Sequence, residues 1–206
     1  MRTIRRRLIL AAASTALGAA SLRFSRPLQA QPSRDGERSV IAQATPASRE
    51  TATVRWRIFE SASGKFKVVF PGAPIRKQTR VRTEIGDVVS TRHNAGDGAG
   101  TTYDVTYDDY AKAGVARLSP AKLLNAVRDG FVHKAKGRLV SEKPFAVDGI
   151  PGSELEILAN NGMWYRTRLL LVENRLYQLT AIVRPPTRSD EQKFFDSFQL
   201  TGLIQP

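Results

Sequence analysis

The sequence predicts an α+β domain in which a central antiparallel β-sheet is flanked by helices on both faces. Segments rich in β-branched residues fall into two groups on either side of one amphipathic segment, and a short helical pattern closes the chain. Short turns separate the segments within each group, so neighbouring strands should run antiparallel. One predicted hairpin is apolar on both faces, which requires a cover on each side of the sheet.

The first group of strands opens with a clear alternation. Phe66, Val68 and Phe70 are interleaved with two lysines and a valine, and the run stops at the proline-bounded turn 71–74 because proline cannot donate to a strand ladder. Similar β-branched content predicts further strands over residues 75–83, 87–93 and 101–108. Short turns and the glycine-rich residues 94–100 separate them, which predicts a meander.

A helix is predicted to begin at Ser119-Pro120, where a capping hydroxyl precedes proline at the first helical position. Apolar residues recur at helical spacing, and Gly137 ends the pattern. The apolar stripe consists of Leu123, Leu124, Val127 and Phe131. Strands are then expected over residues 139–147, 152–159, 163–172 and 175–183, followed by a short helix capped by Ser189 with Phe194, Phe195 and Phe198 on one face.

The register of one hairpin can be predicted from charge. If residues 160–162 form a three-residue loop with glycine in the left-handed conformation, Glu156 faces Arg166 and Glu154 faces Arg168. A two-residue turn would place leucine and isoleucine opposite the arginines, which loses both pairs and about 0.2 to 1 kcal/mol for each. The three-residue loop is therefore preferred.

The following hairpin supplies the apolar pattern on both faces. A turn centred on residues 173–174 sets Leu170 beside Tyr177 and Leu169 beside Gln178. Successive residues of a strand point to opposite faces, so leucine side chains project on both sides of the sheet. One helix on each side would cover them.

Residues 1–30 are predicted to be an export signal. Four arginines precede the uncharged stretch 8–22, and small residues offer cleavage after Ser21 or, preferably, after Ala30. Arg5-Arg6-Arg7-Leu8-Ile9 matches the twin-arginine pattern, so this route and the general secretion route both stay open. An uncleaved membrane anchor is disfavoured because the apolar run is short, and an organelle transit peptide because its helix would be amphipathic. We expect a periplasmic or extracellular protein, or a thylakoid-lumen protein in a photosynthetic cell.

The charge of the chain belongs partly to this signal. Residues 1–30 hold six arginines and no acid, so their removal lowers the formal net charge from +13 to +7. The remaining positive charge suits an anionic partner but gives no argument for nucleic-acid binding. Residues 31–53 are polar and predict a flexible linker, which leaves residues 54–206 as one domain. The chain contains no cysteine, so disulfides and thiol chemistry are excluded.

Several short motifs resemble those of small exported bacterial proteins of unknown function in the PsbP-like superfamily. The resemblance covers residues 54–200 and implies an antiparallel sheet between helices, with no catalytic residues. These motifs are turns, strand ends and core aromatics, so they indicate fold and not function. They are Trp56 with Phe59-Glu60-Ser61, residues 64–74 (Gly-Lys-Phe-Lys-Val-Val-Phe-Pro-Gly-Ala-Pro), Gly152-Ser153-Glu154-Leu155, Asn174-Arg175-Leu176-Tyr177 and Phe194-Phe195-Asp196-Ser197-Phe198.

Signs of catalysis or metal binding are weak. His93 and His133 have no neighbour at ligand spacing, and the Gly-x-Ser-x-Gly elbow of serine hydrolases does not occur. Residues 96–100 resemble a phosphate-binding loop but lead into a predicted strand, which favours a hairpin loop. The carboxylates of Asp104, Asp108 and Asp109 lie near three tyrosines and could bind a cation, but without calcium-loop spacing a solvated strand end is preferred.

Two basic surfaces are possible partner sites. Trp164, Arg166 and Arg168 share a strand face, but the preferred register neutralises both arginines with glutamates. The second surface has fewer acids nearby, and alternation puts its three arginines on one face. It is the preferred site for an anionic partner and consists of Arg76, Arg80, Arg82, Lys65 and Lys67, with Lys77 in the same run.

The resulting functional hypothesis is a non-catalytic binding or assembly module outside the cytoplasm. Its partner would be a protein or an anionic surface, with membrane contact only through the targeting peptide. We expect no catalytic residue, no metal, no cofactor and a monomeric state. The alternative is a small-ligand carrier or an enzyme with a pocket between sheet and helix.

Overall fold

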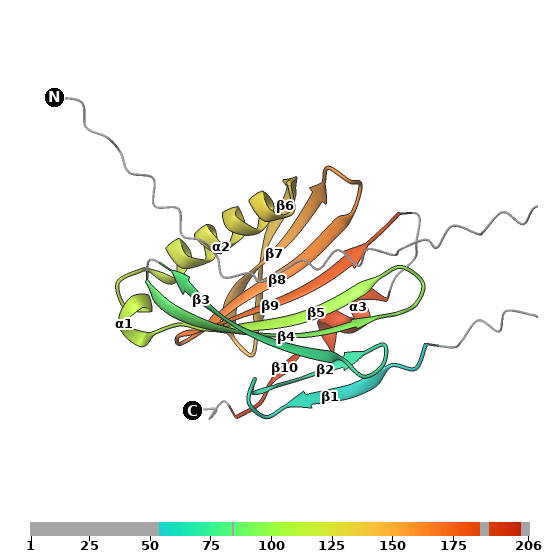
Figure 1. Cartoon of the computed structure of the whole chain (residues 1–206), viewed down its shortest axis with the longest axis horizontal. Coiled ribbons are helices and arrows are strands. Elements are labelled where there is room, and N and C mark those ends of the chain that lie inside the picture. The colour runs from blue at the N-terminus through green and yellow to red at the C-terminus, as the bar shows by residue number, and fades with distance from the viewer. Residues whose placement is uncertain (1–53, 84, 186–189, 203–206) are drawn as a thin grey trace, which may run out of the picture. The chain divides into compact units, whose positions relative to one another are not determined.

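The computed structural model describes residues 54–83, 85–185 and 190–202. The predicted export signal, the linker and the proposed cap at Ser189 lie outside these residues. The described part contains ten strands and three helices, and its strands form two antiparallel sheets (Figure 1).

The larger sheet has seven strands. Three strands of the first predicted group lie on one side of it and the four strands of the second group on the other, whereas the strand at residues 66–70 belongs to the smaller sheet. The two groups join through antiparallel pairing of β5 with β9. β3 and β6 are therefore the two edges of this sheet. In spatial order the strands are β3 (Ile75–Thr83), β4 (Gly86–Gly96), β5 (Thr102–Asp109), β9 (Arg175–Val183), β8 (Trp164–Val172), β7 (Ile150–Ala159) and β6 (Gly137–Val147).

One face of this sheet packs against a small second sheet and a short helix. The small sheet has the order β1-β2-β10 and consists of β1 (Arg57–Ser61), β2 (Phe66–Phe70) and β10 (Gln199–Leu200), with α3 (Glu191–Asp196) just before β10. The predicted alternation on β2 is confirmed, since Phe66, Val68 and Phe70 are buried in the main core. They join Val105, Tyr107, Tyr177, Leu179, Phe194, Phe195 and Phe198 there.

The opposite face carries helix α2 (Pro120–Lys134), which follows the short helix α1 (Lys112–Val115). The predicted start of α2 is confirmed, because the Ser119 hydroxyl accepts a hydrogen bond from the Lys122 amide at 3.3 Å. Leu123, Val127 and Phe131 are buried. The rings of Phe131 and Tyr165 meet edge to face, with 5.9 Å between centroids, so α2 is anchored on β8.

The predicted fold class is wrong in one respect. The described chain is mostly β-strand, and the large sheet is not sandwiched between helices, because its second face is covered mainly by another sheet. On the second face α3 has only six residues, about 9 Å of helix. The small sheet covers much of that face instead, because β1 and β10 pair with β2.

The predicted hairpin register is confirmed. Glu154 pairs with Arg168 and Glu156 with Arg166 in the β7–β8 ladder, and the Ala159 amide donates to the Met163 carbonyl at 2.9 Å. The ion pairs differ from the expected ladder, because Glu154 binds both arginines. Its carboxylate oxygens lie 2.8 Å from Arg166 Nη2 and 2.6 Å from Arg168 Nε.

Candidate functional site

Among the described strands, β3 is an edge strand, and no other described strand pairs with its outer side. It continues into β4 through a two-residue connection, with Thr83 and Gly86 as the closing pair. Such a pair is hydrogen-bonded, and hydrogen-bonded pairs alternate with non-hydrogen-bonded ones along an antiparallel ladder. The backbone N–H and C=O groups of every second residue therefore point away from β4. These residues are Arg76, Gln78, Arg80 and Arg82.

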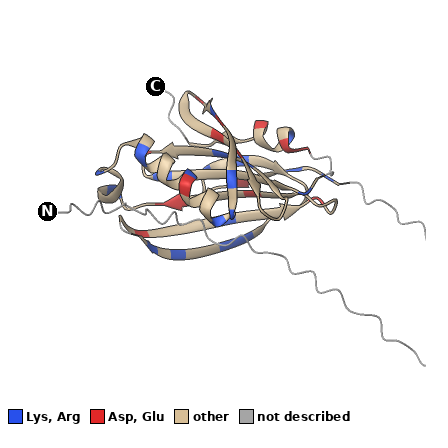
Figure 2. Ribbon diagram, turned by 90° about the horizontal axis from the view of Figure 1, so that it is seen from above, with Lys and Arg blue, Asp and Glu red and all other residues tan. Residues whose placement is uncertain are grey.

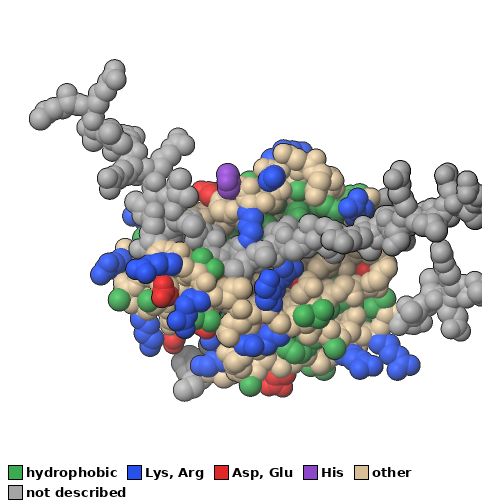
Figure 3. Space-filling view, viewed as in Figure 1, with side chains coloured by type: hydrophobic (Ala, Val, Ile, Leu, Met, Phe, Trp, Pro, Cys, Tyr) green, Lys and Arg blue, Asp and Glu red, His purple; other side chains and the backbone are tan. Residues whose placement is uncertain are grey.

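The side chains of the same four residues share one face of the sheet. All four are exposed, and Gln78 donates a hydrogen bond to the Thr91 hydroxyl at 3.0 Å. We call Arg76, Arg80 and Arg82 the arginine row; Figure 2 shows basic positions strung along this edge strand. Within the described chain none of the three forms an ion pair. Blue side chains spread over the same region in Figure 3, with few red ones among them.

The other two residues of the predicted basic surface lie on the small sheet. Lys67 is exposed on β2, on the opposite side of that strand from its buried aromatic residues, and faces Glu60 in the ladder. Lys65 is exposed at the turn between β1 and β2 and lines a pocket. The structure thus groups the three arginines on β3 and places both lysines in other surroundings.

His93 is buried among aromatic side chains, on the strand next to the arginine row. It faces Arg76 in the β3–β4 ladder, and its ring lies 4.9 Å from that of Phe59 and 5.7 Å from that of Phe66. Burial, together with the charge of Arg76, lowers the pKa of His93 to about 4. His93 is thus a neutral core residue near pH 7.

The expectation of a solvated strand end at Asp104 and Asp108 is wrong. These carboxylates are 6% and 1% exposed, on the face of β5 that lies toward α2. Asp104 accepts from Arg92 Nε at 2.9 Å and Nη2 at 2.6 Å, and from the Asn94 amide. Burial nevertheless raises the pKa of Asp104 despite the adjacent Arg92. The missed signal is the even spacing of four residues, which places both aspartates on one strand face, opposite Asn94 and Ser90 of β4.

The pKa of Asp108 is also raised. Burial raises its pKa from 3.8 to about 7, and Asp109 adds to that effect, while Ser90 and Lys134 act against it. Its Oδ1 atom has no hydrogen-bond partner in the described chain. A carboxyl group with this pKa can exchange a proton near neutral pH.

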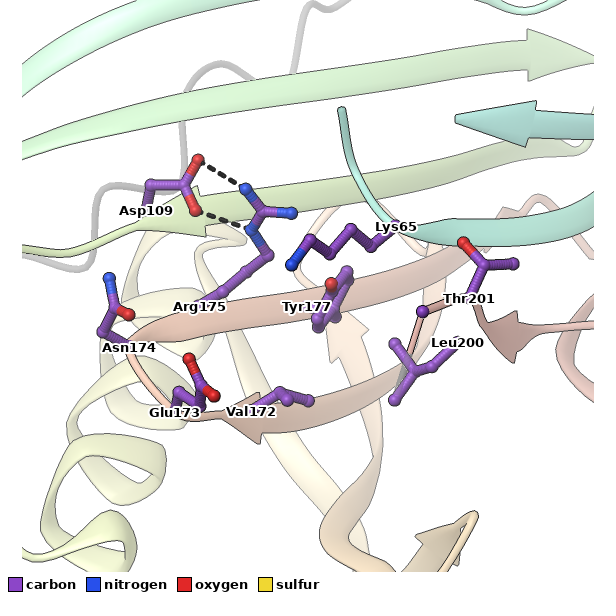
Figure 4. Close-up of a pocket in the computed structure, with 10 residues that line it drawn as sticks. Lys65, Asp109, Val172, Glu173, Asn174, Arg175, Tyr177, Leu200 and Thr201 are labelled. Atoms are coloured by element: carbon purple, nitrogen blue, oxygen red, sulfur yellow. Dashed lines mark hydrogen bonds and ion pairs between the residues drawn. The ribbon is translucent and has the colours of Figure 1, made fainter. Parts of the chain in front are cut away.

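Asp109 has a different environment from its two neighbours. It forms a two-point ion pair with Arg175, with 2.6 Å from Nε to Oδ1 and 3.0 Å from Nη2 to Oδ2. The guanidinium also lies over the Tyr107 ring, 4.7 Å from its centroid. The pair forms one wall of a pocket of about 550 Å³ (Figure 4).

The glycine-rich residues 96–100 form the predicted hairpin loop. Asp97 closes it, because its Oδ1 accepts from the amides of Ala99 at 2.8 Å and Thr101 at 3.0 Å. β5 follows the loop, so no helix N-terminus is present to bind a phosphate.

The described residues contain no group of three or more His, Cys, Asp or Glu residues that could hold a metal ion. Among the same residues, no helix has the length and apolar character needed to cross a membrane.

Two of the solved structures to which the chain is similar come from a cyanobacterium and from Pseudomonas aeruginosa. The chain is similar to the solution structure of cyanobacterial PsbP (CyanoP) from Synechocystis sp. PCC 6803, with a TM-score of 0.49, 12% identity, and coverage of 73% of this chain and 95% of that one. It is also similar to PA94 of Pseudomonas aeruginosa, a protein of unknown function, with a TM-score of 0.32, 7% identity, and coverage of 63% and 83%. No protein-family model and no curated protein matches. Membership of the PsbP-like superfamily stays a prediction.

Proposed function

We propose that the mature chain is an exported binding module that takes up an extended acidic segment of a partner protein along β3. The observation that carries this proposal is the coincidence of two features on the same residues. Arg76, Arg80 and Arg82 offer outward-pointing backbone groups and also guanidinium groups that form no ion pair with any described residue. A partner strand added at this edge would satisfy the backbone, and its acidic side chains would meet the arginine row.

A charged edge strand also has a protective role, since charge discourages edge-to-edge aggregation. Lysine is the residue that most often serves this purpose. Three of the four outward positions on β3 are instead arginine, whose planar guanidinium binds carboxylates at two points. This choice favours recognition of carboxylates over simple repulsion.

Salt-dependent capture from an envelope extract tests the proposal. The mature protein is expected to retain a protein at low salt and to release it at high salt. The triple variant R76E/R80E/R82E should lose the partner, whereas K67E/K143E, which changes two exposed lysines elsewhere, should keep it. Capture of the same protein by the triple variant would refute the role of β3. If the protein binds anionic lipid vesicles and captures no protein, its partner is a membrane surface and the proposal of a protein partner is wrong.

A further inference from the structure

The pocket beside Arg175 carries an unusual charge arrangement. It lies where the β8–β9 turn approaches the β1–β2 turn and the residues after β10. Figure 4 shows the Lys65 side chain extended over Tyr177 toward Arg175, with Glu173 at the β8–β9 turn. Val172 and Leu200 supply apolar lining. We call this site the charged pocket.

Only part of its charge is compensated within the protein. Arg175 is neutralised by Asp109 at two points, and its Nη1 donates to the Ser63 carbonyl at 2.9 Å. Lys65 and Glu173, by contrast, have no ion pair within the described residues. The charged pocket thus offers one available cation and one available anion beside an apolar surface.

The backbone at these two residues is held in a conformation that glycine normally adopts. Lys65 has a φ of 52° and Glu173 a φ of 53°. Positive φ is uncommon for residues with a side chain and is concentrated at functional sites. The described chain has four such residues, and two of them bring opposite charges to the same pocket. Glycine would fit both turns with less strain, yet both positions carry a charged side chain that lines the pocket.

We propose that the charged pocket binds a small zwitterion with an apolar body, such as an amino acid with an aliphatic side chain or a short peptide of such residues. Glu173 would bind the ammonium group, Lys65 the carboxylate, and Val172 and Leu200 the aliphatic part. A volume of about 550 Å³ lies within the range of small-molecule sites. This site is separate from β3 and does not depend on the function proposed for that edge.

Calorimetric titration of the mature protein with L-leucine and L-leucyl-L-leucine tests this assignment. At least one of them should bind at a single site. N-acetylation removes the cation and C-terminal amidation removes the anion of each probe. Each modification should weaken binding at least tenfold.

Glycine variants separate binding from folding. K65G and E173G should each weaken binding at least tenfold and also raise the melting temperature, because glycine relieves the backbone strain. The matched control is K136G, which changes a lysine with a φ of 48° that does not line the pocket. It should raise the melting temperature and leave binding unchanged.

Three results would overturn the assignment. They are no binding of either probe, equal binding of the acetylated or amidated forms, and unchanged affinity in K65G and E173G.

Discussion

Asp104 and Arg92 form a two-point ion pair on the α2 side of the large sheet, with side chains only 8% and 17% exposed. Removing the cation would leave a buried carboxylate without compensation. We therefore expect Arg92→Met to reduce the free energy of unfolding by about 3 to 5 kcal/mol. Urea denaturation measures this loss.

The control for this prediction is Arg128→Met. Arg128 pairs with Asp129 and Glu142, whose side chains are 70% and 32% exposed. Pairs of this kind contribute about 0 to 1 kcal/mol. Equal costs for the two variants would contradict the assignment of a buried pair at Asp104.

Asp108 should make stability fall with increasing pH. Its pKa is about 7 in the fold and 3.8 ordinarily, so the folded protein holds one more proton than the unfolded chain between these values. Stability contributed by the neutral form is complete below pH 4 and is lost as the pH rises to 7. At pH 8 the Asp108→Asn variant should be more stable than the parent, by up to roughly 4 kcal/mol. Urea denaturation at pH 5 and pH 8 gives the comparison, and the exposed-site variant Asp87→Asn should show no such gain.

His93 should act in the opposite direction. Its pKa is lowered to about 4 by burial and by Arg76, so the unfolded chain holds the extra proton between pH 4 and pH 6.5. Stability due to neutral His93 is full above pH 6.5 and is lost as the pH falls toward 4. In the Asp108→Asn background, stability should therefore rise from pH 4 to pH 6.5. If the free energy of unfolding of Asp108→Asn does not change between pH 4 and pH 6.5, and adding His93→Phe to that variant leaves this pH dependence unchanged, His93 does not titrate as a buried group.

Glu154 should matter more than Glu156, although the two residues face equivalent arginines in the ladder. Burial raises the pKa of Glu154, but hydrogen bonds from Arg166 and Arg168 outweigh it and lower that pKa overall. Glu156 forms no ion pair within the described chain. We expect Glu154→Gln to cost about 1 to 3 kcal/mol of unfolding free energy and Glu156→Gln less than 1. Thermal denaturation of both variants measures these two losses. A larger loss of stability for Glu156→Gln than for Glu154→Gln would contradict the geometry.

Local patterns in the sequence were sufficient to predict the registers of the two hairpins in the second group of strands. The registers of the hairpins at residues 160–162 and 173–174 follow from the two segments that flank each turn. The spacing of charged and apolar residues on those segments fits one pairing only. The cap at Ser119 is equally local. Such features depend on residues close in the chain, which is why they could be predicted.

The second sheet depends on distant residues. β10 has two residues and pairs with β2 more than 130 positions earlier, so it carries almost no local signal. The even spacing of Asp104 and Asp108 placed them on one face of β5, but their burial depends on distant residues of α2 such as Lys134, which that local pattern does not contain. At the candidate site, alternation correctly put Arg76, Arg80 and Arg82 on one face, but sequence alone did not identify β3 as an edge.

Amide hydrogen exchange on β3, with and without the partner captured from the envelope, tests the central proposal most directly. In the free protein the amides of Arg76, Gln78, Arg80 and Arg82 should exchange quickly, while those of the intervening residues are protected by β4. Partner binding should protect these four amides and leave Lys67 unaffected. A bound partner that leaves the four amides exchanging at their free rates would contradict strand addition at β3.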